Sequence, residues 1–132
     1  MKLIDRLKTG DVIYTNCIDL AFCRHVGIVY DDGHKKRIFH NTPTMSNRYG
    51  GTICSESYED FMKNRQVIHV LRTHATAEDI LTVSRKNKKE SYNEFFFNCE
   101  DYVLEVVEGH RRSDLRDAWK IAALGILIIT FI

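Results

Sequence analysis

Short stretches of alternating or continuous apolar residues dominate the first two thirds of the chain. Valine, isoleucine and aromatic residues are enriched there, and the stretches are bounded by Gly, Asp and Asn, which predicts β-strands. We expect strands over 12–15, 24–30, 37–40 and 66–72. Asp32-Gly33, between the second and third of these, is typical of a two-residue hairpin turn. Residues 41–56 carry the only proline and a Gly-Gly pair, so a long loop is expected there.

Helix signals lie mainly in the second half of the chain. Ser57 and Thr76 are each placed to cap a helix that follows them. Asn98, with Asp101 three residues later, predicts the start of a further helix, which Gly109 ends. Strands followed by helices in this order are typical of an α+β domain.

Two histidines become neighbours if the hairpin has its expected turn. A two-residue turn at Asp32-Gly33 places His25 directly opposite His40, with Cβ atoms about 4.5–5.5 Å apart on one face of the sheet. A neutral histidine can accept a proton from a thiol, and a second polar ring can orient it. Either histidine alone also fits a surface or structural role, which is our interpretation of the other four.

Cys99 occupies the first turn of the helix expected after Asn98. It shares one face of that helix with three valines, so the thiol is expected to point inward. A helix N-terminus favours a thiolate, but Glu100 and Asp101 oppose this effect, so an activated Cys99 needs a base nearby. The alternative is a small buried apolar residue, which is our interpretation of the other three cysteines.

Composition narrows the choice of function. The chain has 132 residues, of which 44% are hydrophobic, which fits one compact domain, assigned to 1–112. A net charge of +1 gives no reason to expect a nucleic-acid partner. No CxxC pair is present, so neither a metal site nor a cofactor is expected. The N-terminus lacks the apolar core of a secretory signal, which predicts a cytoplasmic protein with free thiols.

The remaining residues, 113–132, end in a segment with no charge. Ile121–Ile132 is twelve residues long, whereas a membrane span needs roughly 20. Three interpretations stay open for it: a short membrane anchor, a segment lying in the membrane interface, and a terminal helix buried against the domain. The first two would make the protein membrane-associated.

Four stretches taken in order resemble a known family. They are "GDVIYT", "RHVGIVYDDG", "IFHNTP" and "YNEFFFNCEDYV". Together they resemble the lecithin retinol acyltransferase-like group of the NlpC/P60 superfamily, over about residues 10–107. The resemblance implies a circularly permuted papain-like fold, with a small antiparallel sheet packed against helices. Asp101 and Tyr102 stand where the family has His and Phe, which leaves the subfamily open.

The resemblance implies a role for each candidate residue. Cys99 would be the nucleophile, His25 its base and His40 the residue that orients His25. The implied reaction forms a thioester acyl-enzyme and then transfers the acyl group to an amine, an alcohol or water. The implied enzyme is a phospholipid acyl hydrolase or acyltransferase. Its partner is a lipid or acyl substrate.

Two other functions are compatible with the same fold. One is a cysteine amidase or peptidase acting on peptides or peptidoglycan fragments, and the other is a catalytically silent interaction protein. Substrate-binding residues are less defined: Tyr14 either donates a hydrogen bond or packs, and Tyr49 and Met45 are candidates to line an acyl pocket. The acyl donor, the acceptor and the oligomeric state stay open at this stage.

Overall fold

The computed structural model describes residues 2–16, 24–42, 48–50, 52–92 and 98–111. Its strands are β1 (Val12–Asn16), β2 (Arg24–Asp31), β3 (Lys36–Asn41), β4 (Arg48–Gly50), β5 (Ile53–Ser57) and β6 (Val67–Leu71). Its helices are α1 (Leu3–Arg6), α2 (Tyr58–Met62), α3 (Ala77–Lys86) and α4 (Cys99–Glu108). The strands form one antiparallel sheet in the order β4-β5-β3-β2-β1-β6. The predicted α+β class is confirmed.

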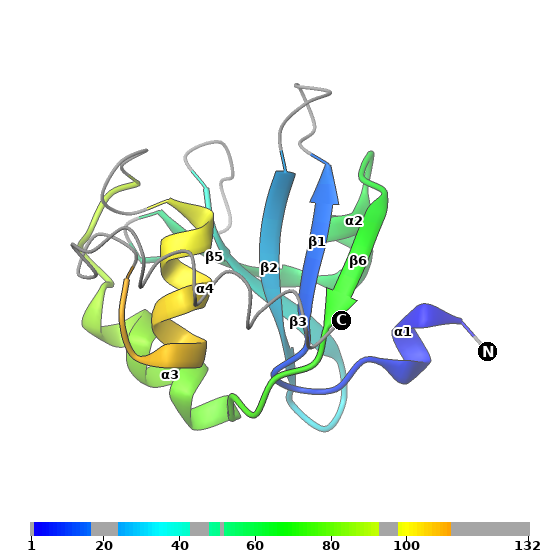
Figure 1. The fold of residues 1–132 in the computed structure, drawn as a ribbon, viewed down its shortest axis with the longest axis horizontal. Coiled ribbons are helices and arrows are strands. Elements are labelled where there is room, and N and C mark those ends of the chain that lie inside the picture. Colours follow the sequence, from blue (N-terminus) through cyan, green and yellow to red (C-terminus); the bar gives the residue numbers. More distant parts are fainter. Residues whose placement is uncertain (1, 17–23, 43–47, 51, 93–97, 112–132) are drawn as a thin grey trace, which may run out of the picture.

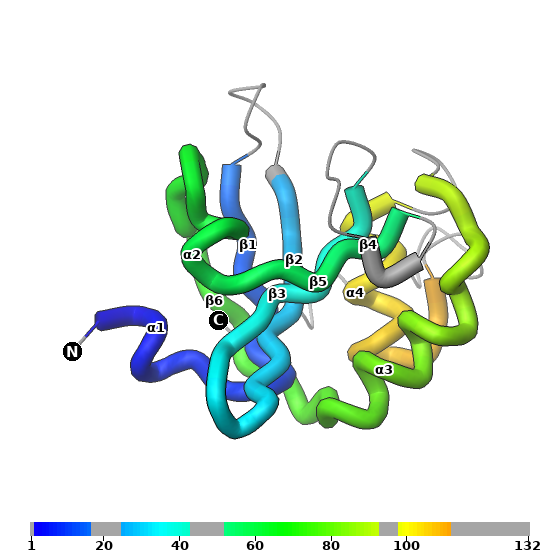
Figure 2. Tube along the Cα trace, turned by 180° about the vertical axis from the view of Figure 1, so that it is seen from behind, coloured from blue at the N-terminus to red at the C-terminus, as the bar shows by residue number. Residues whose placement is uncertain are grey.

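Helices cover the two faces of this sheet unequally. Figure 1 shows α3 and α4 side by side on one side, and Figure 2, from behind, shows α2 crossing the other. Side chains alternate between the faces along each strand. Val12 therefore packs in the cluster that contains Val103 of α4, whereas Ile13 packs in the cluster that contains Phe61 of α2. We call these the α4 face and the α2 face.

Local capping signals correctly located the starts of α2, α3 and α4, whereas α1, which has no side-chain cap, was not predicted. The Ser57 hydroxyl accepts a hydrogen bond from the backbone N–H of Asp60 at 3.1 Å. Thr76 forms the same contact with Asp79 at 3.1 Å, and the Asp79 carboxylate accepts from the Thr76 backbone N–H at 2.9 Å. Gly109 adopts φ +80° where α4 ends, as a helix C-terminus requires.

The predicted hairpin register is wrong. Asp31 pairs with Lys36, so four residues rather than two form the turn between β2 and β3. One Asp32 carboxylate oxygen accepts hydrogen bonds from the backbone N–H groups of His34 and Lys35 at 2.8 and 2.7 Å. These bonds stabilise the longer loop, which an Asp-Gly pair alone does not disclose. Each partner moves by two positions, an even shift that keeps every side chain on its expected face.

The expected loop over 41–56 is also partly wrong. It contains β4 and most of β5, and β5 pairs with β3 from Arg37–Ser57 to Asn41–Ile53. Ile53 is buried, while the glycines and proline that suggested a loop all precede β5. A neighbouring strand therefore supplies the hydrogen bonds that make β5 a strand, and local propensity does not reveal such a partner.

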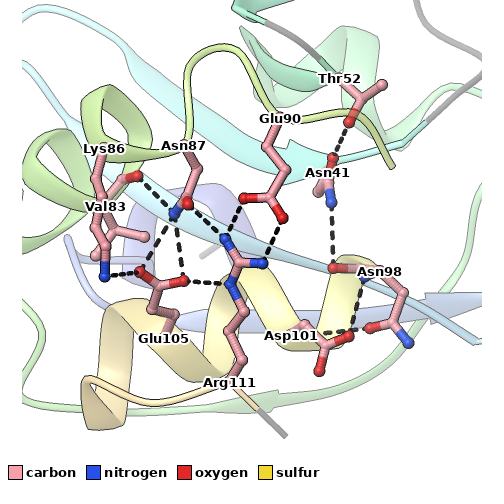
Figure 3. Close-up of polar contacts among 10 residues, drawn as sticks. All are labelled: Asn41, Thr52, Val83, Lys86, Asn87, Glu90, Asn98, Asp101, Glu105 and Arg111. Carbon is pink, nitrogen blue, oxygen red and sulfur yellow. Dashed lines mark hydrogen bonds and ion pairs between the residues drawn. The ribbon is translucent and has the colours of Figure 1, made fainter. Parts of the chain in front are cut away.

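A partly buried polar cluster joins α3, α4 and the chain that follows α4. Figure 3 shows the Arg111 guanidinium between Glu90 and Glu105. Its Nε donates to Glu105 at 2.7 Å, and Asn87 donates to the same carboxylate at 3.3 Å. Glu105 is buried, so these contacts compensate for its lost hydration. The cluster holds α4 against α3, which fixes the helix that carries Cys99.

Gly27 on β2 leaves room for the core of the α2 face. A Cβ at this position would lie 2.5 Å from Cγ2 of Ile38 and 3.1 Å from the Phe61 ring. We therefore expect Gly27→Ala to lower the free energy of unfolding by about 1–3 kcal/mol, the usual cost of overpacking. Urea unfolding followed by circular dichroism measures this change.

The control for Gly27→Ala is the same substitution in an Ile38→Ala background. Removing Cγ2 of Ile38 opens the space that the new methyl group needs, so the two substitutions should couple. An equal cost of Gly27→Ala in both backgrounds would show that the contact with Ile38 is not its cause.

Candidate functional site

Cys99 is the first residue of α4, as predicted. The Asn98 side-chain oxygen accepts from the backbone N–H of Asp101 at 2.9 Å, and the Asp101 carboxylate accepts from the Asn98 backbone N–H at 3.0 Å. This reciprocal pair is the predicted capping box. Figure 3 shows a further tie, in which the Asn41 amide donates to the Asn98 carbonyl at 3.3 Å. Asn41 thus connects the end of β3 to the start of α4.

The surroundings of Cys99 keep its thiol protonated. The side chain is 8% exposed and belongs to the apolar cluster of the α4 face. Burial raises the pKa of the Cys99 thiol to about 11, although the backbone N–H of Val26 lowers it, and the negative charge of Glu100 raises it further. The helix N-terminus therefore does not by itself activate this cysteine.

A chain of two hydrogen bonds links three buried side chains on the α2 face. Nε2 of His25 lies 2.7 Å from Nδ1 of His40, and Nε2 of His40 lies 3.0 Å from Oε1 of Glu56. His25 is 7% exposed, and His40 and Glu56 are buried completely or nearly so. The two predicted histidines are thus in contact, but as diagonal neighbours on β2 and β3 and not as a directly opposed pair.

The setting of these histidines disfavours their charged forms. The Phe61 ring lies 5.0 Å from the His40 ring and 6.0 Å from the His25 ring, and the Arg65 guanidinium stacks over Phe61 at 5.1 Å. Burial, then the charges of His40 and Arg65, lower the pKa of His25 to about 2. Burial also lowers the pKa of His40, although the hydrogen bond to Glu56 opposes this. Both rings are therefore neutral at pH 7.

Cys99 and His25 approach the same end of β2 from its two faces. Cys99 packs beside Val26 on the α4 face, whereas the ring of His25 packs beside Phe61 on the α2 face. Ladder pairing between β2 and β3 ends at Ile28–Phe39, while β2 itself begins at Arg24. In the part of the chain described, no hydrogen bond joins the Cys99 thiol to His25. The structure joins His25 to His40 by a hydrogen bond, and among the described residues no such bond joins Cys99 to either histidine.

Glu56 and Asn41 are site residues that the sequence did not reveal. The proline and the Gly-Gly pair of 41–56 indicate a loop, and this hides the strand that carries Glu56. Asn41 follows His40 directly, but only the fold brings its side chain to Asn98, 57 residues later in the chain. The stretch 53–57 reads Ile-Cys-Ser-Glu-Ser and does not alternate between apolar and polar residues, so the sequence carries no signal for a buried Glu56.

Of the three candidate substrate-binding residues, only the side chain of Tyr14 is described by the structure. Tyr14 lines an apolar pocket of roughly 40 Å³ together with Val12 and Val26, and it contacts the His69 ring at 4.4 Å. A pocket of that size is far below the roughly 300 Å³ at which ligand sites begin, so in this form it holds no acyl chain. Met45 and the Tyr49 side chain lie outside the described part of the chain.

The apolar segment Ile121–Ile132 also lies outside the described residues. Among the helices that are described, none is both long enough and apolar enough to cross a membrane. Within the same residues, no group of three or more His, Cys, Asp and Glu side chains is arranged to hold a metal ion.

Comparison with known proteins found no matching family model, no matching curated protein and no matching solved structure.

The buried histidines predict a loss of stability in acid. Folding lowers the pKa of both His25 and His40 below 6.5, the ordinary histidine value. Below pH 6.5 the unfolded chain therefore binds more protons than the folded chain. The stability that the two neutral histidines contribute is complete above pH 6.5. For His25 it is lost progressively as the pH falls toward a pKa of about 2. For His25 the loss is about 1.4 kcal/mol per pH unit below 6.5, and His40 adds a loss in the same direction. Chemical denaturation at pH 7.5 and 5.5 measures the difference.

A His25→Gln variant is the test of that assignment, because Gln does not titrate. Its stability should fall less than that of the native chain between the two pH values. His34→Gln is the matched control, since His34 is exposed in the turn and should leave the pH dependence unchanged. An equal acid response in all three proteins would assign the effect to other groups.

Proposed function

We propose that this protein is a thiol-dependent acyl hydrolase or acyltransferase acting on lipid-like esters through Cys99. The observation that carries the proposal is the chain from His25 through His40 to Glu56, which is the arrangement of a base and the groups that orient it. It lies at the strand end where α4 begins with a cysteine. The permuted papain-like fold is proposed with it, because a cysteine-bearing helix packs on a sheet that carries the histidines.

The reaction has two stages. The Cys99 proton passes to His25, and the thiolate attacks the ester carbonyl carbon and forms a C–S bond. The C–O bond then breaks as the leaving oxygen takes the proton from His25, which leaves a thioester. Water, an alcohol or an amine next gives a proton to His25 and attacks the thioester. The C–S bond breaks, and the sulfur recovers the proton.

The reactive form requires a change from the structure described. The thiol of Cys99 is protonated and has no hydrogen bond to His25, so its side chain or the ring of His25 must turn toward the other near the end of β2 where ladder pairing with β3 has stopped. We propose that substrate binding on the α4 face produces this change by displacing apolar contacts of Cys99. The lipid class follows from the family resemblance and from the apolar segment at the end of the chain.

The test is the mass of the intact protein after incubation with vesicles of mixed phosphatidylcholines. We expect a mass gain equal to one acyl chain, located on Cys99, together with released lysophospholipid. A parallel incubation with a peptidoglycan-derived peptide should give no adduct. An adduct from the peptide alone would replace the lipid substrate by an amide, and no adduct or product from either would remove the enzymatic proposal.

A catalytically silent interaction protein of the same fold is the second candidate. The observation that favours it is the thiol of Cys99, which is buried, has its pKa raised to about 11 and has no hydrogen bond to His25. A thiol-directed probe applied with and without lipid vesicles separates the two functions. With vesicles of a diether phospholipid, which cannot acylate the thiol, the enzyme should be labelled at Cys99 faster than without lipid, and the silent protein should be labelled slowly in both cases.

A further inference from the structure

We propose that Glu56 is a positioning residue that acts through His40 to place the free lone pair of His25 on Nδ1. This role rests on the proposed function, because it matters for turnover only if His25 is the base. The hydrogen-bond partner of the Glu56 side chain among the described residues is His40. Its effect is transmitted through two hydrogen bonds between buried side chains.

The sheet register brings Glu56 to His40. β5 pairs with β3 so that Cys54 stands opposite His40 and Glu56 stands opposite Ile38. Positions 38 and 40 of β3 lie on the same face, so Glu56 is a diagonal neighbour of His40. Its carboxylate reaches Nε2 of His40 at 3.0 Å, and both residues are within 1% of complete burial.

The direction of each hydrogen bond follows from the carboxylate. An ionised carboxylate only accepts hydrogen bonds, so Nε2 of His40 must carry a proton. A neutral His40 then has its lone pair on Nδ1, and it accepts from Nε2–H of His25 at 2.7 Å. Neutral His25 therefore has no proton on Nδ1, which becomes the only nitrogen able to take the thiol proton.

A protonated Glu56 would reverse the chain. The carboxylic acid would donate to Nε2 of His40, Nδ1–H of His40 would donate to Nε2 of His25, and the proton of His25 would lie on Nδ1. His25 would then have no free lone pair for the thiol. The two charge states of Glu56 thus predict opposite tautomers for both histidines, which makes the assignment measurable without any turnover.

The second oxygen of Glu56 indicates that the carboxyl group is not placed there for stability. Oε2 is buried and has no hydrogen-bond partner among the described residues. A buried carboxylate with one contact is costly to the fold, so stability alone does not explain its presence. Orientation of the histidine pair does explain it.

The experiment is long-range ¹⁵N–¹H NMR of the histidine rings in the full chain at pH 7.5. The native protein should show His25 and His40 both protonated on Nε2 only. Glu56→Gln should populate the other tautomer of both rings, because an amide can donate as well as accept. Glu105→Gln is the matched control: it also neutralises a buried glutamate, but on the α4 side, and should leave both tautomers unchanged.

Kinetics with phosphatidylcholine vesicles supply the second reading. Glu56→Gln should lower kcat by on the order of 10²- to 10⁴-fold with little change in KM, since Glu56 orients the base and binds no substrate. If native His25 carries its proton on Nδ1, or if Glu56→Gln leaves both tautomers unchanged, the role of Glu56 is overturned. The native spectrum decides this even if the variant does not fold. Absence of turnover with the predicted tautomers would instead refute the proposed function alone.

Discussion

Cys99→Ala is expected to abolish acyl transfer, with a loss of at least about 10⁴-fold in turnover, because the proposed thioester forms on the sulfur that this substitution removes. The fold should survive, since the side chain is small and 8% exposed and its removal costs about 1 kcal/mol. The measurement is lysophospholipid release from vesicles, together with a thermal unfolding curve of the same preparation.

Cys54→Ala is the matched control for this substitution. Cys54 and Cys99 are the free thiols in the described part of the chain, and both are buried. Cys54 lies on the α2 face, directly opposite His40 on the neighbouring strand. It is therefore a thiol beside the histidine pair. We expect Cys54→Ala to retain turnover. If Cys54→Ala is inactive and Cys99→Ala is active, the nucleophile has been assigned to the wrong thiol.

His25→Gln is expected to reduce turnover nearly as much as Cys99→Ala, because residues that act as one catalytic unit do not contribute additively. Gln cannot take the thiol proton, so the thioester cannot form at a useful rate. The reactivity of the Cys99 thiol without lipid, in contrast to turnover, should not change. Since no hydrogen bond joins His25 to Cys99 in the structure described, the alkylation rate of Cys99 should still rise toward pH 11 without lipid.

His34→Gln provides the comparison, because His34 is an exposed histidine in the turn between β2 and β3. Its turnover and its thiol titration should match those of the native chain. Retained turnover in His25→Gln would exclude His25 as the base. A clear change in the Cys99 titration of His25→Gln without lipid would show that the two residues already interact in the resting protein.

Capping of the helices was predictable because its causes are local. The side chains of Ser57, Thr76 and Asn98 each bond a backbone group three residues away, so a short stretch of sequence contains both partners. The strands β1, β2, β3 and β6 were predictable for a related reason, since runs of apolar and β-branched residues favour a pleated, half-buried chain.

The pairing between strands was harder to predict from the sequence. The hairpin turn is held by hydrogen bonds to Asp32 that lengthen the loop, and β5 is a strand because β3 lies beside it. The contact of His25 with His40 was still anticipated, although the register that led to it was wrong. A shift by two positions preserves the face of a strand, so the two rings remained within reach of each other.

The sequence by itself determined the helix start at Cys99, most of the strands and the α+β class, because each depends on residues close together in the chain. Only the tertiary structure decided that Glu56 completes the histidine chain and that Cys99 and His25 approach β2 from opposite faces. Both depend on which strand lies beside which and on how α4 packs. These relations join residues more than ten positions apart, and local patterns do not encode them.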